Sequence, residues 1–246
     1  MLGASHFLAL GAFSVLMLVD SRTLNNVNVW LKPMKFAISI GIFSWTMAWL
    51  LVYLPESRTK NVVVWTITVT MVIEMVCIAG QAGRGVLSHF NISSPMNGAI
   101  YALMGIAIGV NTFAVAGVLR LFFQETTIDA ETTYLWAIRC SLCIFIVASL
   151  QGYLMGGRLQ HSVGAPDGTF GLPFLAWSRS VGDLRVMHFI GLHAIQVLPL
   201  LGFFLARVFA PSTATSLVLG AFVVYALLCV LALVQALAGQ PFVRLS

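Results

Sequence analysis

The segment LVLGAFVVYALLCVLALV, Leu217–Val234, decides the fold class. Its 18 residues include no charged side chain, and an α-helix of about 20 such residues crosses the ~30 Å hydrocarbon layer of a bilayer. The whole chain has the same character, since 59% of its 246 residues are hydrophobic and 9% are charged, against about 45–50% and about 25% in soluble domains. These values exclude a water-soluble globule, a disordered chain and a coiled coil, and they indicate a helical integral membrane protein.

Seven apolar segments predict an all-α bundle of seven transmembrane helices that forms one domain over residues 1–246. The expected helices cover residues 2–19, 34–54, 61–88, 96–123, 132–155, 184–209 and 212–238. Asp183 is expected to cap the sixth helix and Pro199 to kink it. Six helices remain possible if the first segment lies only at the membrane interface. The one long connection, 157–182, predicts a lid, a re-entrant element or a binding loop, or a loop whose aromatic side chains rest at the interface.

Cysteines and net charge add little chemistry. The four cysteines, the Cys140–Cys143 pair included, lie inside apolar runs, where a thiol usually serves as a small core residue. A redox or zinc role for the C-x-x-C pair is the alternative. The formal charge of +5 needs no nucleic-acid partner, because Lys and Arg commonly flank membrane helices. Counting them gives eight on one side and four on the other, which weakly favours an outside N-terminus and an inside C-terminus.

Ionisable residues inside a membrane helix cost about 2.5–3.5 kcal/mol each on insertion scales, so each one predicts a functional site. The third segment carries Glu74, Gln81 and Arg84 along one stripe, followed by His89. A structural Glu–Arg pair, or a neutral and hydrogen-bonded Glu74, is the alternative interpretation.

The sixth segment carries a second polar group. His188 and His193 are about 140° apart on an ideal helix, with Gln196 between them in angle, so the three residues could line one groove. If all seven helices span, one membrane face is expected to hold His89, His161, His188, Arg84, Arg158, Asp183 and Arg185.

Three stretches resemble segments of a bacterial family of uncharacterised multi-pass inner-membrane proteins. They are Leu31–Phe36, Gln81–Asn91 and Gly182–Gln196. The resemblance covers about a fifth of the chain and implies a bacterial inner-membrane protein with about seven spans, but it implies no activity.

Two classes of function fit these residues. In the first, a polar site between the third, fifth and sixth helices binds a transition metal or haem for redox or hydrolytic chemistry. Its predicted metal ligands are His89, His161 and His188, its catalytic residues Glu74, Arg84 and Asp183, and its further cofactor-binding residues His193, Gln196 and Gln81. In the second, the chain is a small proton-coupled carrier of an anionic substrate. A partner-dependent subunit or sensor, whose polar residues only hold helices together, is a third possibility. The oligomeric state stays open.

Overall fold

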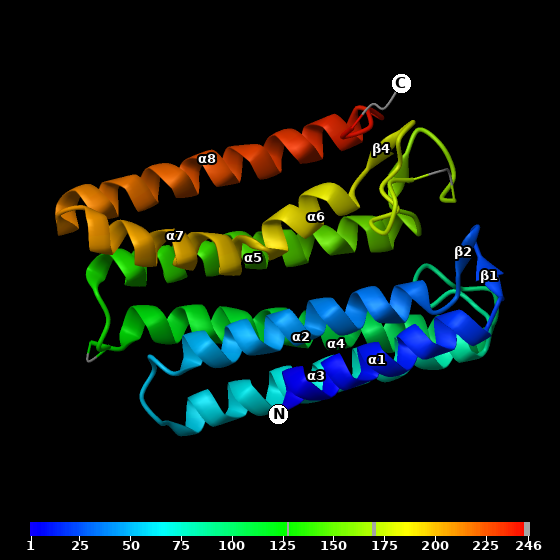
Figure 1. Cartoon of the computed structure of the whole chain (residues 1–246), viewed down its shortest axis with the longest axis horizontal. Coiled ribbons are helices and arrows are strands. Elements are labelled where there is room, and N and C mark those ends of the chain that lie inside the picture. The colour runs from blue at the N-terminus through cyan, green and yellow to red at the C-terminus, as the bar shows by residue number, and fades with distance from the viewer. Residues whose placement is uncertain (127, 169–170, 244–246) are drawn as a thin grey trace. The chain divides into compact units, whose positions relative to one another are not determined.

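The described part of the chain is mostly helical and has two very short strand pairs (Figure 1). The structure is a computed structural model that describes residues 1–126, 128–168 and 171–243. Arg244, which the charge count includes, lies outside these residues. The helices are α1 (Leu2–Val19), α2 (Leu31–Leu51), α3 (Arg58–Gly83), α4 (Pro95–Gln124), α5 (Thr132–Arg158), α6 (Arg185–Leu192), α7 (Ala194–Val208) and α8 (Pro211–Leu237). Strand β1 (Thr23–Leu24) pairs antiparallel with β2 (Val27–Asn28), and β3 (Ser162–Val163) with β4 (Gly182–Asp183).

Seven helices in the described chain are long and apolar enough to cross a membrane, counting α6 and α7 as one span from Arg185 to Val208. The predicted all-α fold and the count of seven are therefore confirmed. The structure fits a multi-pass membrane protein.

The chain forms two compact units. Unit 1 contains Met1–Trp49 and Asn61–Ala114, and unit 2 contains Leu50–Lys60 and Val115–Ser246. The prediction of a single transmembrane domain stays a prediction, and the two units are considered one at a time.

In unit 1, small residues let α1 and α2 approach closely. A Cβ on Gly3 would overlap the Trp45 ring, and one on Gly41 would lie 2.8 Å from the Phe7 ring. Phe7 and Trp45 also contact each other, with ring centroids 4.6 Å apart. Glycine at these positions thus permits the close helix packing that membrane bundles favour.

In unit 2, α5 is the central helix. It packs against α6, α7 and α8 around a buried apolar cluster that includes Cys140, Ala148 and Cys229. A Cβ on Gly191 of α6 would overlap the Cβ of Ala148, and one on Gly202 of α7 would lie 2.5 Å from the Cβ of Ala137. The expectation that Cys140 and Cys229 are core thiols is confirmed.

The bounds of helices α2 and α3 differ from the sequence predictions. Helix α3 ends at Gly83 instead of residue 88, because Gly85 adopts a left-handed conformation (φ +70°). The backbone N–H groups of Gly85 and Val86 donate to the carbonyls of Ala82 and Gln81, the pattern of a glycine-terminated helix. His89 therefore lies in the α3–α4 connection. Helix α2 begins at Leu31 instead of residue 34, since proline is tolerated in a first turn.

The sixth predicted helix is divided at His193, six residues before Pro199, which lies inside α7. The N-cap of α6 is Leu184, so the prediction that Asp183 occupies this position was wrong. Asp183 belongs to β4, and the backbone pairing of β3 with β4 holds it there. Its carboxylate nevertheless accepts the backbone N–H of Arg185 at 3.1 Å, which satisfies one free donor at the start of α6.

Candidate functional site

Glu74 is the most deeply buried acidic residue of unit 1. Its side chain lies near the middle of α3 and the residue is 2% exposed. One carboxyl oxygen, Oε1, has no hydrogen-bond partner among the described residues. Lys32, in the first turn of α2, is close enough to attract the carboxylate electrostatically. A carboxyl group in such a position is costly unless it is neutral or compensated, and this makes Glu74 the leading functional residue of unit 1.

Two polar contacts between α3 and α4 lie on either side of Glu74 along α3. Thr70 Oγ1 is 3.3 Å from Asn111 Oδ1, and Gln81 Nε2 donates to Asn97 Oδ1 at 3.2 Å. Thr70, Glu74 and Gln81 share one face of α3, because residues four and seven apart superpose on a helix. The predicted polar stripe on this helix is confirmed for Glu74 and Gln81, and it extends to Thr70 and to two asparagines of α4.

Arg84 extends this stripe at the end of α3. Its Nη1 group donates to Gln81 Oε1 and, at 3.1 Å, to Asn97 Oδ1. Arg84 itself is exposed, whereas Gln81 and Asn97 are buried. The buried side-chain amides of Gln81 and Asn97 thus position the guanidinium of Arg84, although the residue is exposed.

His89 lies among aromatic rings. The ring centroid of Phe36 is 5.4 Å from that of His89, and the centroid of Tyr101 is 6.5 Å away. Its Nδ1 atom is 3.1 Å from Ser88 Oγ. These contacts hold the ring of a residue that was predicted to be a metal ligand.

Two Asp-x-Arg sequences form the same local structure, one in each unit. In unit 1, Asp20 accepts from the Arg22 backbone N–H (3.1 Å), from Nε (3.0 Å) and from Nη2 (2.6 Å). In unit 2, Asp183 accepts from the same three groups of Arg185 at 3.1, 2.9 and 2.6 Å. Each Arg also donates to a distant backbone carbonyl, of Gly83 in unit 1 and of Ala176 in unit 2.

Each aspartate has a further partner. The Trp30 indole donates to Asp20 Oδ2 at 2.8 Å, and the backbone N–H of Ser178 donates to Asp183 Oδ2 at 2.9 Å. Hydrogen bonds from Arg22 and then from Trp30 hold the pKa of Asp20 well below its usual range. Asp20 and Arg22 were not among the predicted site residues; the repeated Asp-x-Arg spacing was the signal that could have found them.

Asp183 is the centre of a polar cluster that organises the 157–182 connection. It is 1% exposed. His161 Nδ1 lies 3.5 Å from Asp183 Oδ1, and His161 Nε2 lies 3.4 Å from Asp167 Oδ2. Burial opposes ionisation of Asp183, but hydrogen bonds from Arg185 and His161 outweigh it and hold its pKa well below the usual range. Asp183, which was predicted to be catalytic, and His161, which was predicted to be a metal ligand, thus lie together and contact each other.

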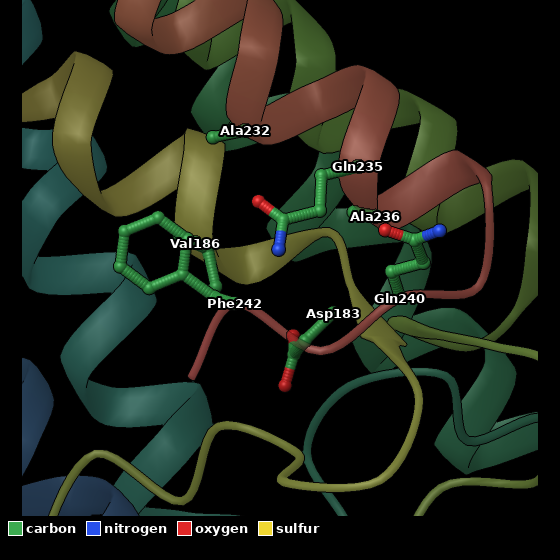
Figure 2. A pocket seen from close by; sticks show the side chains of 7 residues that line it. All are labelled: Asp183, Val186, Ala232, Gln235, Ala236, Gln240 and Phe242. Atoms are coloured by element: carbon green, nitrogen blue, oxygen red, sulfur yellow. The ribbon is translucent and has the colours of Figure 1, made fainter. Parts of the chain in front are cut away.

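A small pocket lies beside this cluster. Figure 2 shows Asp183 on one side of it and the side chains of Gln235 and Gln240, from the end of α8 and the residues after it, on the other. The pocket has no room for a water molecule. It therefore offers no substrate site, and the Asp183 cluster acts as a structural tie.

His188 differs from the other predicted site residues of unit 2 in its hydrogen-bond partner, which is a backbone carbonyl. Its Nδ1 donates to the backbone carbonyl of Ala148 on α5 at 2.7 Å. Gly152 makes room for the ring, since a Cβ there would lie 3.0 Å from His188 Cε1. With Nδ1 carrying the proton, Nε2 keeps its lone pair, which is the usual preparation of a histidine ligand.

His193 and Gln196 contact each other at the junction of α6 and α7. His193 Nδ1 is 3.1 Å from Gln196 Oε1, and its ring packs on Phe189 with centroids 4.3 Å apart. The expected wide groove shared with His188 stays a prediction.

Within the described ranges, no group of three or more His, Cys, Asp or Glu side chains is arranged to hold a metal ion. Glu74, Gln81, Arg84 and His89 belong to unit 1, whereas His161, Asp183, His188, His193 and Gln196 belong to unit 2. The meeting of these two sets in one site stays a prediction.

His6 is a residue that sequence reasoning passed over. It is 4% exposed, and it lines a cavity of about 130 Å³ in unit 1 together with residues of α3. Only its position near the start of α1 was visible in the sequence, and no pattern there points to a site.

In comparisons with known proteins, no family model, no curated protein and no solved structure matches the chain.

Proposed function

We propose that this chain is a small proton-coupled carrier of an anionic substrate in the inner membrane of a bacterium, with Glu74 as the proton-binding group. The observation that carries the proposal is the buried carboxyl oxygen of Glu74 that has no hydrogen-bond partner among the described residues. An acid kept only for structure would be expected to have both oxygens paired, because an unsatisfied buried polar atom costs about 1–3 kcal/mol.

The surroundings of Glu74 suit a group that exchanges a proton. Lys32 attracts the ionised form, whereas burial favours the neutral form. The two α3–α4 polar contacts, at Thr70 and at Gln81, continue the polar path along α3 in both directions. Thr70 and Gln81 are 11 positions apart, or about 16 Å at a rise of 1.5 Å per residue, which is roughly half the thickness of the hydrocarbon layer.

Basic residues at one end of unit 1 support an anionic substrate. Arg84 follows α3, and Lys32 and Lys35 lie in the first turns of α2. The bond from Arg22 to the Gly83 carbonyl ties the α1–α2 connection to this same end of α3. This end of unit 1 therefore has four basic residues and one acid, Asp20, which pairs with Arg22. The excess positive charge would attract an anion.

The test uses the purified protein in liposomes that enclose a pH-sensitive dye, with inorganic phosphate and succinate as the two anionic probes. We expect internal acidification that requires one of these anions and that disappears in Glu74→Gln. Glu56→Gln is the matched control, because the Glu56 side chain is 79% exposed and pairs with Lys60, in the first turn of α3. Anion-dependent acidification of equal rate in Glu74→Gln would refute the assignment.

A substrate-independent test uses a hydrophobic carbodiimide, which modifies protonated carboxyl groups inside membranes. Mass spectrometry should find the adduct on Glu74 and not on Glu56, and the yield should fall as pH rises. An unmodified Glu74 across the accessible pH range would show that this carboxyl does not take up a proton.

A haem protein is the second candidate, and it is favoured by His188. Because no described side-chain group can hold a bare metal ion, a cofactor that brings its own equatorial ligands needs less from the chain, namely one or two axial imidazoles. The Ala148 bond leaves His188 Nε2 available for that role. A Soret band in the purified protein that is lost in His188→Ala and kept in His6→Ala would favour this candidate; absence of the band in the wild type would eliminate it.

A further inference from the structure

We propose that a cavity between α1 and α3 binds the hydroxyl-bearing ring of a lipid-soluble phenol, a class that includes quinols, with His6 as the hydrogen-bond acceptor. The cavity measures about 130 Å³ and is lined by Ser5, His6, Ala9, Val72, Met75 and Val76. All of these residues belong to unit 1. The inference does not depend on the role proposed for Glu74.

The protonation pattern of His6 defines what the cavity can bind. His6 Nδ1 lies 2.9 Å from the backbone carbonyl oxygen of Leu2. A carbonyl only accepts, so Nδ1 carries the proton, and Nε2 of the neutral ring is an acceptor. Nε2 is buried and has no hydrogen-bond partner among the described residues. Since the residue is 4% exposed, the missing partner is a hydrogen-bond donor that the described chain does not supply.

The wall of the cavity favours a ring over water or an acyl chain. The cavity is open on one side and holds about 130 Å³ of space, whereas enclosed cavities of ~150 Å³ hold one whole benzene ring. Water molecules filling the same space would each need two to four polar partners, and the polar residues that line it are His6 and Ser5, whose hydroxyl already donates to the Leu2 carbonyl at 2.7 Å. An acyl chain has no donor for Nε2. A ring hydroxyl has one, and the Met75 thioether is a favourable neighbour for an aromatic ring.

The position of the cavity allows entry from the lipid. Val72 and Val76 of α3 are 44% and 65% exposed, and Leu8 on the neighbouring turn of α1 is 78% exposed. In a helix long and apolar enough to span the bilayer, exposed valines face hydrocarbon. A phenol dissolved in the membrane would therefore reach His6 without crossing an aqueous phase.

The test uses the full chain in phosphatidylcholine nanodiscs and a pair of photoreactive probes, a diazirine-bearing 4-alkylphenol and its O-methyl ether. The two probes have the same ring and chain, but only the phenol can donate to His6. We expect the phenol to label α1 and α3 peptides that line the cavity and the ether to label them at least tenfold less, as the loss of one buried hydrogen bond implies. Equal labelling by both probes would overturn the proposal.

Three variants locate the contact. His6→Leu should reduce phenol labelling about tenfold, and His6→Gln, which keeps an acceptor at this position, should restore part of it. Ala9→Phe fills the cavity while leaving His6 in place, so it should abolish labelling even if the His6 variants fold poorly. Unchanged phenol labelling in Ala9→Phe would exclude this cavity, and labelling by a diazirine fatty acid that excess phenol fails to displace would show that an acyl chain occupies it.

Discussion

Replacing Asp183 by Ala tests whether the Asp183 cluster holds unit 2 together. The substitution leaves the backbone N–H groups of Ser178 and Arg185 without their acceptor and leaves the Arg185 guanidinium without its carboxylate. Removing one partner of a buried ion pair costs about 3–5 kcal/mol. Because the Arg185 side chain is 28% exposed and can regain some hydration, we expect the lower end, about 3 kcal/mol, which is roughly a hundredfold in the unfolding equilibrium.

The assay is reversible unfolding in mixed micelles, followed by circular dichroism and by tryptophan fluorescence. Asp129→Ala is the matched control, an exposed aspartate of the same unit, and it should change the free energy of unfolding by less than about 0.5 kcal/mol. Equal effects of the two substitutions would refute the view that the Asp183 cluster ties the connection 157–182 to the start of α6.

The pKa of Asp183 adds a pH dependence with a definite sign. Its folded pKa is held below the usual range, so its contribution is fully present above the unfolded value of about 3.9 and is lost as pH falls below that value toward the folded pKa. The difference in unfolding free energy between the wild type and Asp183→Asn should therefore be fully present at pH 5 and should shrink below about pH 4. A difference that does not shrink below about pH 4 would contradict the assignment.

Four further substitutions probe packing, backbone conformation and one hydrogen bond. Gly191→Ala, whose new Cβ would overlap Ala148, should destabilise the protein by about 1–3 kcal/mol; Gly220→Ala in α8, where a Cβ would meet nothing within 4 Å, should be neutral or stabilising by up to about 1 kcal/mol in the same unfolding assay. Gly85→Ala should cost about 1–2 kcal/mol, because φ is +70° there, seen as a lower thermal midpoint. Tyr225→Phe should cost about 0.5–1.5 kcal/mol, since the hydroxyl donates to an α6 carbonyl at 2.7 Å, measured by urea unfolding in micelles.

The helices were predictable because the apolar runs carry the information locally. A span such as α8 is specified by its own residues, and bilayer thickness sets its length. Boundaries were less predictable, since they depend on one backbone conformation. The third helix was predicted to continue to residue 88, but Gly85 in a left-handed conformation ends it five residues earlier, at Gly83.

The polar sites were predictable only in part. The shared face of Glu74 and Gln81 follows from helical periodicity within one element, whereas the partners that decide their roles come from other elements. Asn97 and Asn111, on α4, drew no attention in the sequence, yet they supply the contacts of the α3 stripe. His6 was missed for the same reason, since its cavity exists only once α1 lies against α3.

The contrast between Asp183 and Glu74 explains why the proposed function rests on the latter. Both residues are 2% exposed or less, so both carry the cost of taking a carboxyl group out of water. Ser178 and Arg185 donate hydrogen bonds to both carboxylate oxygens of Asp183, and these bonds offset the cost of its burial. A carboxylate stabilised in this way does not take up a proton near neutral pH. Glu74 keeps Oε1 without a partner among the described residues. A buried carboxyl with an unused oxygen can change its proton occupancy without first breaking a hydrogen bond at that oxygen, which is the property that a proton-coupled cycle requires.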